Sequence, residues 1–508
     1  MWTITFLVRL SHTNECSFIS AYSTHSTGTT SGVLAFTNSK RKQIYVPLIE
    51  KAFAKLHGSF GALEGGTCAE GLQALTGCPV ITLKLKNSSK VDTAQDGHFA
   101  RLDSSRMLWV RLLSSFEAGY LMAAACHPSN VKEALSLGLQ ASHAYSILSV
   151  KGFEGHHLIK LRNPHGTNST TYRGDWGVQS TKWTAKLRNH FSEYRTGGSD
   201  SGVFWIMVQD FFKYFHVVHI CEVPKMSSSK EENMNRFETR HSSRMVSLND
   251  AHGNLSVFQL EFKERATRVS VVLHQPRQFR HGGSAALIGM VIVKLVGSDH
   301  NSVKFVDCSE WAPGGSVLLQ CDFDVGKYIL IPIAIDHHVK DSQWVLAVHS
   351  TKRVCVTNFK APRGLVSRSF VLMCRRRGKQ MAHHGDVSLY RYTISCGAIF
   401  VALNKSRVVS SQVSLQANAR NAKMIKANER NNVVISSERF ETNDMIEPRK
   451  CQVLAVVTPI RYNMPWQWNI QMGIKHSMSA FFRTSFASKP DVTSSGLYDA
   501  FPIGSVVL

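Results

Sequence analysis

The feature that most constrains this chain is a pair of segments rich in strand formers, at 143–150 and 157–163, that flank a turn-like sequence. The turn-like sequence, 151–155, contains two glycines, which favour a reversal of the chain. We therefore predict an antiparallel hairpin centred on Phe153. In that register His143 and Asn163, each ten residues from Phe153, lie directly across from one another.

The predicted pairing gives these two residues a chemical relationship. Directly opposed residues on antiparallel strands have Cβ atoms ~4.5–5.5 Å apart. At that separation, the side-chain oxygen of Asn163 holds the imidazole of His143 in one tautomer. An asparagine has this orienting role as the third member of a Cys-His-Asn triad. His143 and Asn163 are therefore the candidate catalytic residues.

Several motifs around this hairpin match a known family. His-Ala-Tyr-Ser occupies 143–146 and Leu-Arg-Asn-Pro occupies 161–164. Further matching segments lie upstream, at 41–43, 46–52, 54–59, 65–66, 70–72 and 75–77. Together these motifs resemble the calpain family of papain-like cysteine proteases, and the Arg-Lys-Gln sequence at 41–43 is most similar to its small-optic-lobes branch. The resemblance covers residues 30–222 specifically and 250–508 more diffusely.

The resemblance implies an endopeptidase that performs limited proteolysis of intracellular proteins. A cysteine thiolate would attack the peptide carbonyl, His143 would take the thiol proton and later protonate the leaving amine, and Asn163 would orient the imidazole. The competing interpretation is a catalytically inactive protein in which the same fold serves as a binding or scaffold module.

The nucleophile of this family lies in a Leu-Gly-Asp/Asn-Cys-Trp-Phe-Leu segment, and this chain has no such segment. The nearest sequence is 14–20, which contains Cys16 but lacks the Gly and the Trp. Two interpretations stay open. In one, Cys16 is the nucleophile; in the other, which we favour, Cys16 belongs to an unrelated leader and the N-terminal part of the catalytic domain is missing.

Two other positions depart from the family pattern. A Trp that shields the His-Asn hydrogen bond in the family is replaced by His165. One family calcium site uses the carboxylates of Asp-Gly-Glu-Phe-Trp, but this chain has Ser-Gly-Val-Phe-Trp at 201–205, with Asp200 and Asp175 nearby. Calcium binding is therefore implied by the resemblance but is not supported by the acidic residues at this position.

Length and patterning predict an α+β protein of several domains. Residues 1–222 are expected to form a truncated papain-like catalytic domain with helices at 46–56, 67–77, 103–118 and 210–215, and 223–249 a polar linker. Eight short strands between 255 and 357 predict an antiparallel C2-like β-sandwich at 250–358. Residues 365–508 are expected to form a further β-rich domain, with strands at 366–373, 388–394, 398–403 and 452–458 and a polar loop at 417–450.

Composition limits the partners and the compartment. The net charge is +23, but the basic residues are scattered and no nucleic-acid motif accompanies the one dense cluster, at 375–379. We expect protein substrates and no nucleic-acid partner, and weak contact between the basic β-domains and an anionic membrane surface stays open. The eleven cysteines show no regular spacing, which favours a reducing, cytoplasmic compartment. The oligomeric state is not predicted.

Other residues with potential chemistry are expected to be structural. The histidine pairs at 156–157, 337–338 and 383–384 are poor chelators, because adjacent strand residues point to opposite faces. No metal site is predicted there. Cys68 and Cys126 are expected to be core thiols, and the aromatic residues Trp176, Trp183, Phe204 and Trp205 are expected to pack in the core.

Overall fold

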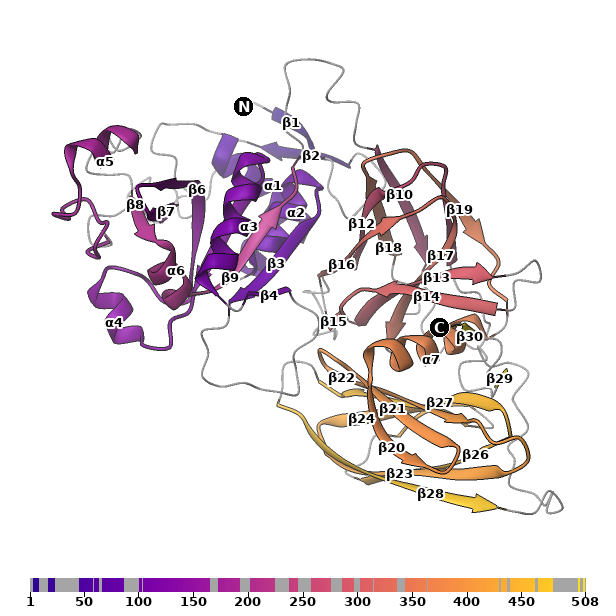
Figure 1. Ribbon diagram of the computed structural model, residues 1–508. Helices are drawn as coiled ribbons and strands as arrows, with labels where there is room; N and C mark the ends of the chain where they lie inside the picture. The colour runs from indigo at the N-terminus through magenta and orange to yellow at the C-terminus, as the bar shows by residue number, and fades with distance from the viewer. Residues whose placement is uncertain are drawn as a thin grey trace. The chain divides into compact units, whose positions relative to one another are not determined.

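The computed structural model divides the chain into two compact units (Figure 1). The first comprises Met1–Asp92 and His98–Arg236, and the second comprises Thr93–Gly97 and Phe237–Leu508. The residues that the structure describes are 3–8, 17–22, 45–57, 59–63, 66–85, 100–102, 104–164, 172–191, 202–223, 237–244, 257–275, 286–296, 302–313, 315–335, 343–362, 364–428, 431–435, 439–461, 465–477, 501–502 and 506–507. The domain boundaries predicted from the sequence stay predictions.

A seven-stranded sheet organises the first unit, with the order β4-β3-β9-β5-β6-β7-β8. The strands are β3 (Val80–Leu85), β4 (Ala100–Leu102), β5 (Leu121–Cys126), β6 (His143–Phe153), β7 (His156–Arg162), β8 (Val203–Met207) and β9 (Phe215–Cys221). All neighbours are antiparallel except β3 and β4. A separate two-stranded sheet pairs β1 (Thr3–Val8) with β2 (Ser17–Tyr22). Cys16 lies outside the described residues.

Four helices of the first unit, α2 to α5, begin at residues whose side chains cap them. The described helices of this unit are α1 (Tyr45–His57), α2 (Cys68–Thr76), α3 (Ser105–Glu117), α4 (Val131–Ser136), α5 (Ala185–His190) and α6 (Val208–Tyr214), with a 3₁₀ turn η1 (Gly61–Leu63). At α2, Thr67 and Glu70 form a reciprocal capping box, and Gly77 ends the helix at φ 69°. Ser104 caps α3. The predicted helices at 46–56, 67–77, 103–118 and 210–215 are confirmed to within a few residues.

Two sheets packed face to face form the first part of the second unit. One has the order β10-β18-β12-β16 and the other β19-β11-β17-β13-β14-β30, with β15 (Ala312–Pro313) paired to β13. The strands are β10 (Phe237–Arg244), β11 (Val257–Phe262), β12 (Thr267–His274), β13 (Leu287–Val296), β14 (Ser302–Cys308), β16 (Ser316–Phe323), β17 (Gly326–Ile335), β18 (Gln343–Ser350), β19 (Val354–Phe359) and β30 (Val506–Val507). One buried cluster joins their facing sides. All eight predicted strands are present.

One strand of this sandwich corrects the predicted linker. Strand β10 lies within 223–249 and pairs antiparallel with β18 along its whole length. Its sequence, Phe-Glu-Thr-Arg-His-Ser-Ser-Arg, is polar enough to read as a flexible connection. The segment is nevertheless a strand, because its backbone pairs with β18.

The second part of the unit contains two more sheets. Their orders are β20-β21-β22-β27-β24-β25, with β29 paired to β27, and β26-β23-β28. The strands are β20 (Lys379–His384), β21 (Val387–Ile394), β22 (Gly397–Asn404), β23 (Ser410–Arg420), β24 (Ala422–Asn428), β25 (Asn431–Ile435), β26 (Arg439–Ile446), β27 (Lys450–Pro459), β28 (Gln467–Ser477) and β29 (Phe501–Pro502). The strands predicted at 388–394, 398–403 and 452–458 are confirmed.

Two predictions for this region were wrong. The strand predicted at 366–373 is part of helix α7 (Leu365–Arg377), whose residues are buried from Leu365 to Cys374. The helix packs between β13, β14 and β17 on one side and β21, β22 and β27 on the other. Burial on every face removes the amphipathic period that identifies a helix from sequence.

The polar loop predicted at 417–450 also proved wrong, because that interval contains β24, β25 and β26. In β26 buried and exposed residues alternate strictly, with Phe440, Thr442, Asp444 and Ile446 inside. Two of these four buried residues are polar, so the strand period was not visible as hydrophobic alternation.

Candidate active site

The turn of the hairpin that carries His143 and Asn163 is centred between Glu154 and Gly155 rather than on Phe153. The last pair of the ladder is Phe153 with His156, so Glu154 and Gly155 form the turn, with φ values of 49° and 78°. Two successive positive φ values suit the two-residue turns that match the twist of a hairpin. The predicted register, centred on Phe153, is wrong.

A β-bulge restores the placement of His143 and Asn163 on one face of the sheet, although not the predicted register. Near the turn Ser149 pairs with Lys160, but beyond it Ile147 pairs with Leu161, so Leu148 is an extra residue in β6. If the pairing seen near the turn continued without a bulge, Asn163 would lie opposite Ser146. Its side chain would then be on the opposite face of the sheet from His143. The bulge moves the alignment by one residue, which places Asn163 on the same face as Tyr145 and His143.

The predicted contact between His143 and Asn163 is present, although the two residues are diagonal rather than directly opposed. His143 Nε2 lies 3.0 Å from Asn163 Oδ1. A carboxamide oxygen only accepts hydrogen bonds, so Nε2 must carry the hydrogen. In neutral imidazole, the lone pair able to take a proton is then on Nδ1.

Burial and a backbone hydrogen bond fix the position of Asn163. Its side chain is fully buried, and its backbone N–H donates to the Gly202 carbonyl at 2.9 Å, just before β8. His143 is the first residue of β6, where it pairs with Cys126 at the end of β5. Both residues thus lie at the same end of the β6–β7 pair, where the asparagine is buried and the histidine is half-buried.

Tyr145 supports the histidine from within the core. Its ring meets that of His143 edge to face, with centroids 5.1 Å apart, and it packs in the same way on Phe204 and Phe215. The backbone N–H of Gln140 donates to its hydroxyl at 2.8 Å. Burial raises the pKa of Tyr145 to about 12, so the phenol stays neutral at physiological pH.

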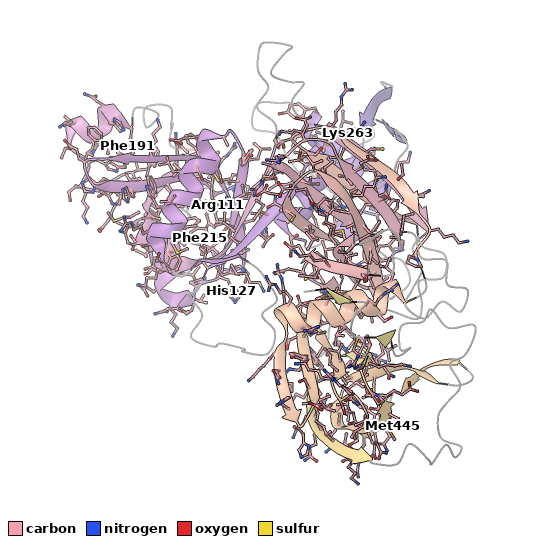
Figure 2. The ribbon with its side chains drawn as sticks, turned by 45° about the vertical axis from the view of Figure 1, so that its right-hand side comes forward. Arg111, His127, Phe191, Phe215, Lys263 and Met445 are labelled. Carbon is pink, nitrogen blue, oxygen red and sulfur yellow. The ribbon has the colours of Figure 1, made fainter. Side chains whose placement is uncertain are left out.

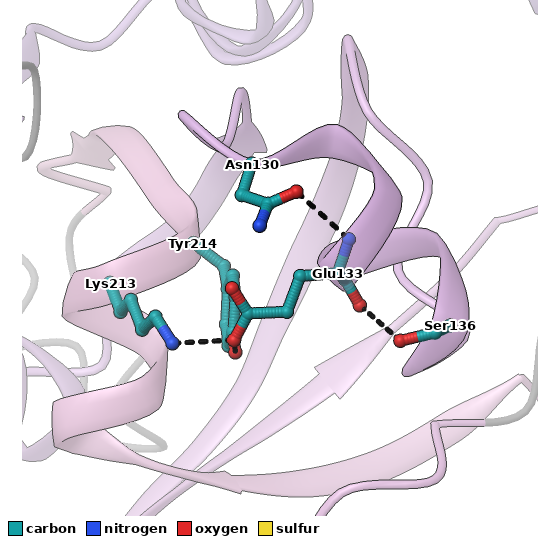
Figure 3. Close-up of polar contacts among 5 residues, drawn as sticks. All are labelled: Asn130, Glu133, Ser136, Lys213 and Tyr214. Carbon is teal, nitrogen blue, oxygen red and sulfur yellow. Dashed lines mark hydrogen bonds and ion pairs between the residues drawn. The ribbon is translucent and has the colours of Figure 1, made fainter.

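A polar contact between α4 and α6 fixes the segment that leads into β6 (Figure 3). Glu133 Oε1 lies 2.5 Å from Lys213 Nζ and accepts a hydrogen bond from the Tyr214 hydroxyl at 2.7 Å. These bonds, from Lys213 first, lower the pKa of the Glu133 carboxyl. Asn130 caps α4 by accepting from the Glu133 backbone N–H, and Ser136 donates to the Glu133 carbonyl.

Sequence reasoning missed this contact because it missed helix α4. The signal was present as Asn130 followed three residues later by Glu133, a pattern typical of a helix start. The helix has only six residues and too few apolar positions to show a period.

The described thiols near the site are structural. Cys126 is fully buried, donates to the Tyr214 carbonyl, and has its pKa raised to about 12 by burial. Burial also raises the pKa of Cys68. Since the thiolate is the reactive form, neither is suited to attack a carbonyl. The prediction of a core thiol is confirmed for Cys126, whereas Cys68 is only half-buried.

The predicted core aromatics are confirmed. Trp176, Trp183, Phe204 and Trp205 are each at most 5% exposed. Three of them belong to one cluster with Phe191, Leu158 and Leu187. His165, which replaces a family tryptophan, lies outside the described residues.

The adjacent histidines of β7 point apart, as predicted. His156 packs on Trp176 at 4.9 Å, whereas His157 stacks on Trp109 of α3 at 4.4 Å. In the second unit, His383 Nδ1 lies 3.1 Å from the Ser388 hydroxyl. The pair at 337–338 lies outside the described residues.

The residues near the expected calcium position do not form a site in the part of the chain that is described. Asp175 is ion-paired with Lys182 at 2.5 Å, and Asp200 and Ser201 lie outside the described residues. Within the described ranges, no group of three His, Cys, Asp or Glu side chains could hold a metal ion. The described helices likewise include none that could span a membrane.

Comparison with known proteins agrees with the motifs of the first unit. The family model for calpain family cysteine proteases matches residues 8–222. The calpain-type cysteine protease DEK1 of Zea mays is 35% identical over 196 residues, which are 38% of this chain and 8% of that protein. Calpain-B of Drosophila melanogaster is 30% identical over 227 residues, covering 42% of this chain and 22% of that protein.

A longer match extends into the second unit. Calpain-5 of Mus musculus is 25% identical over 341 residues, 60% of this chain and 51% of that protein. The chain thus spans about half of this relative and much less of the other two. A solved structure, Momordica charantia 7S globulin, aligns with a TM-score of 0.11 and 8% identity over 50% of this chain and 76% of that one, too weak to indicate a shared fold. On the family match and the relatives together, residues 8–222 of this chain are similar to the calpain family of cysteine proteases.

Proposed function

We propose that this protein is a calpain-type cysteine endopeptidase that performs limited proteolysis of intracellular proteins. The observation that carries the proposal is the 3.0 Å contact between His143 Nε2 and Asn163 Oδ1, within the region that matches the family. The proposal includes a papain-like catalytic core in the first unit. It also includes a C2-like domain, formed by the first β-sandwich of the second unit.

In the proposed mechanism His143 is the catalytic base and acid, and Asn163 is its positioning residue. Because Asn163 holds the hydrogen on Nε2, Nδ1 accepts the proton of an attacking thiol. The thiolate adds to the peptide carbonyl, and His143 then protonates the leaving amine. Water hydrolyses the resulting thioester, with the same nitrogen as base.

The mechanism also needs a nucleophilic thiol. Cys126 and Cys68 have raised pKa values, and the segment that comes nearest to the family's nucleophile sequence contains Cys16, so Cys16 is the candidate nucleophile that the labelling experiment tests. If Cys16 does not react, the chain is instead a calpain-like binding or scaffold protein. The poor fit of 14–20 to the family pattern is the observation that favours this second candidate.

The family suggests calcium regulation, and the cysteines suggest a cytoplasmic location. Calcium regulation is expected from the family, but Asp175 is ion-paired with Lys182, and no proposed step uses the ion. The cysteines of the described residues are all free thiols, which supports a cytoplasmic location. The partners proposed are protein substrates.

Labelling with a thiol-reactive peptide epoxide tests the proposed function. The epoxide should alkylate Cys16 in the wild-type chain, and His143→Ala should lower the rate at least 100-fold, because the base is lost. His190→Ala is the matched control, since His190 is an exposed histidine of the same unit. Alkylation of no cysteine, or equal alkylation in the His143→Ala variant, supports the binding-protein alternative.

A further inference from the structure

Two histidines outside the proposed triad lie together at the junction of β5 and β9. His127 directly follows β5, and His216 is the second residue of β9 (Figure 2 labels His127 and Phe215). The β5–β9 ladder pairs Cys126 with Phe215 but Ala125 with Val217, so His216 is the extra residue of a bulge. Both histidine side chains are exposed.

The distance between the two rings fits a shared metal ion. Their centroids are 5.4 Å apart, and the ring planes meet at 65°. A zinc ion bonded to one nitrogen of each ring at ~2.1 Å lies ~3.2 Å from each centroid, so a tetrahedral angle separates the centroids by ~5.2 Å. The observed centroid separation of 5.4 Å is close to this value.

Each ring also has a partner of the kind that orients metal-bound histidines. His127 Nδ1 lies 3.4 Å from the Ser142 hydroxyl, which can accept its hydrogen and leave Nε2 with a lone pair. His216 forms a hydrogen bond with the backbone of Ala125. Metal-ligating histidines usually donate their second nitrogen to such oxygens, which fixes the tautomer and the ring orientation.

Lys84 is a positive charge near His216, and it weakens the attraction of this position for a cation.

We propose that His127 and His216 form a two-histidine site for a zinc-class transition-metal ion, with water molecules completing its coordination. The site is compatible with the lack of a three-residue group among the described residues, because the protein supplies only two ligands. It is independent of the proposed triad, although Ser142 immediately precedes His143.

Titration of the full chain with Zn²⁺ by isothermal calorimetry tests this proposal. The chain contains 23 histidines, so weak background binding is expected and the variants carry the comparison. His127→Asn and His216→Asn should each weaken the tightest site at least tenfold. His190→Asn, at an exposed histidine whose described ring contacts are with Phe153 and Phe191, should change the affinity less than threefold.

Two further measurements keep the result decisive if a histidine variant folds poorly. Lys84→Gln should strengthen Zn²⁺ binding, because it removes the neighbouring positive charge. Zn²⁺ should also shift the imidazole resonances of His127 and His216 in NMR spectra of the wild-type chain before those of other histidines. The proposal is wrong if Zn²⁺ shifts other histidines first, or if His190→Asn weakens binding as much as His127→Asn.

Discussion

At the scale of single residues, the contact between His143 and Asn163 depends on a buried carboxamide. Asn163 is fully enclosed, so its polar atoms have lost water and depend on protein partners. The residue types and their spacing were enough to predict that these two side chains meet. The diagonal geometry was not predictable, because it depends on a turn and a bulge rather than on the two residues themselves.

Asn163→Ala should destabilise the first unit by about 1–3 kcal/mol, since it removes a hydrogen bond and leaves a gap in a buried position. The imidazole of His143 should also lose its preference for the Nε2–H tautomer, so that the Nδ1–H form becomes populated. Urea unfolding measures the first effect, and ¹⁵N NMR of the imidazole measures the second. An unchanged tautomer would show that Asn163 does not orient the ring.

Tyr145 gives the first unit a pH dependence in the alkaline range. Its folded-state pKa of about 12 exceeds the usual value of 10.0, so the folded form holds the phenolic proton more tightly. The resulting stability is fully present below pH ~10 and is lost as the pH rises towards 12. Tyr145→Phe should flatten the fall in urea midpoint between pH 10 and 12; an equally steep fall in the variant would assign it to other groups.

At the scale of secondary-structure elements, the bulge in β6 decides which face of the sheet His143 occupies. The strand segments and the hairpin were predictable from strand formers and glycines. The bulge was not, because Leu148 is an apolar residue that looks like any other strand residue in sequence, yet is 42% exposed in the structure. Helix α7 and strand β26 were mispredicted for the related reason that burial, not local pattern, determines their form.

Deletion of Leu148 should separate His143 from Asn163, because the uninterrupted register places them on opposite faces of the sheet. NMR of the His143 imidazole should then show loss of the Nε2 hydrogen bond. Leu148→Ala is the matched control: it keeps the extra residue and should leave the hydrogen bond intact. A deletion variant that folds and keeps this bond would contradict the proposed role of the bulge.

At the scale of the whole molecule, the proposed chemistry belongs to the first unit and the second is organised around α7. Phe370 of this helix is fully buried in a core shared by two sheets and packs edge to face on Trp311 at 5.9 Å. Strand β17 is buried on both faces for the same reason, since alternate residues join the sandwich core and the α7 core.

Phe370→Ala should destabilise the second unit by about 3–5 kcal/mol through loss of aromatic burial and creation of a cavity. Hydrogen exchange of the first unit should be unchanged, because each buried cluster among the described residues belongs to one unit. Arg376→Ala, at an exposed position of the same helix, is the control and should have little effect. Equal loss of protection in both units would show that they unfold as one.

The most direct test of the proposed function is hydrolysis of an unstructured protein substrate by the purified chain. The account predicts cleavage at a few sites that falls at least 100-fold in His143→Ala and persists in His190→Ala. Hydrolysis that survives in His143→Ala, or its complete absence in the wild-type chain with and without Ca²⁺, would contradict the assignment of this chain as an active peptidase.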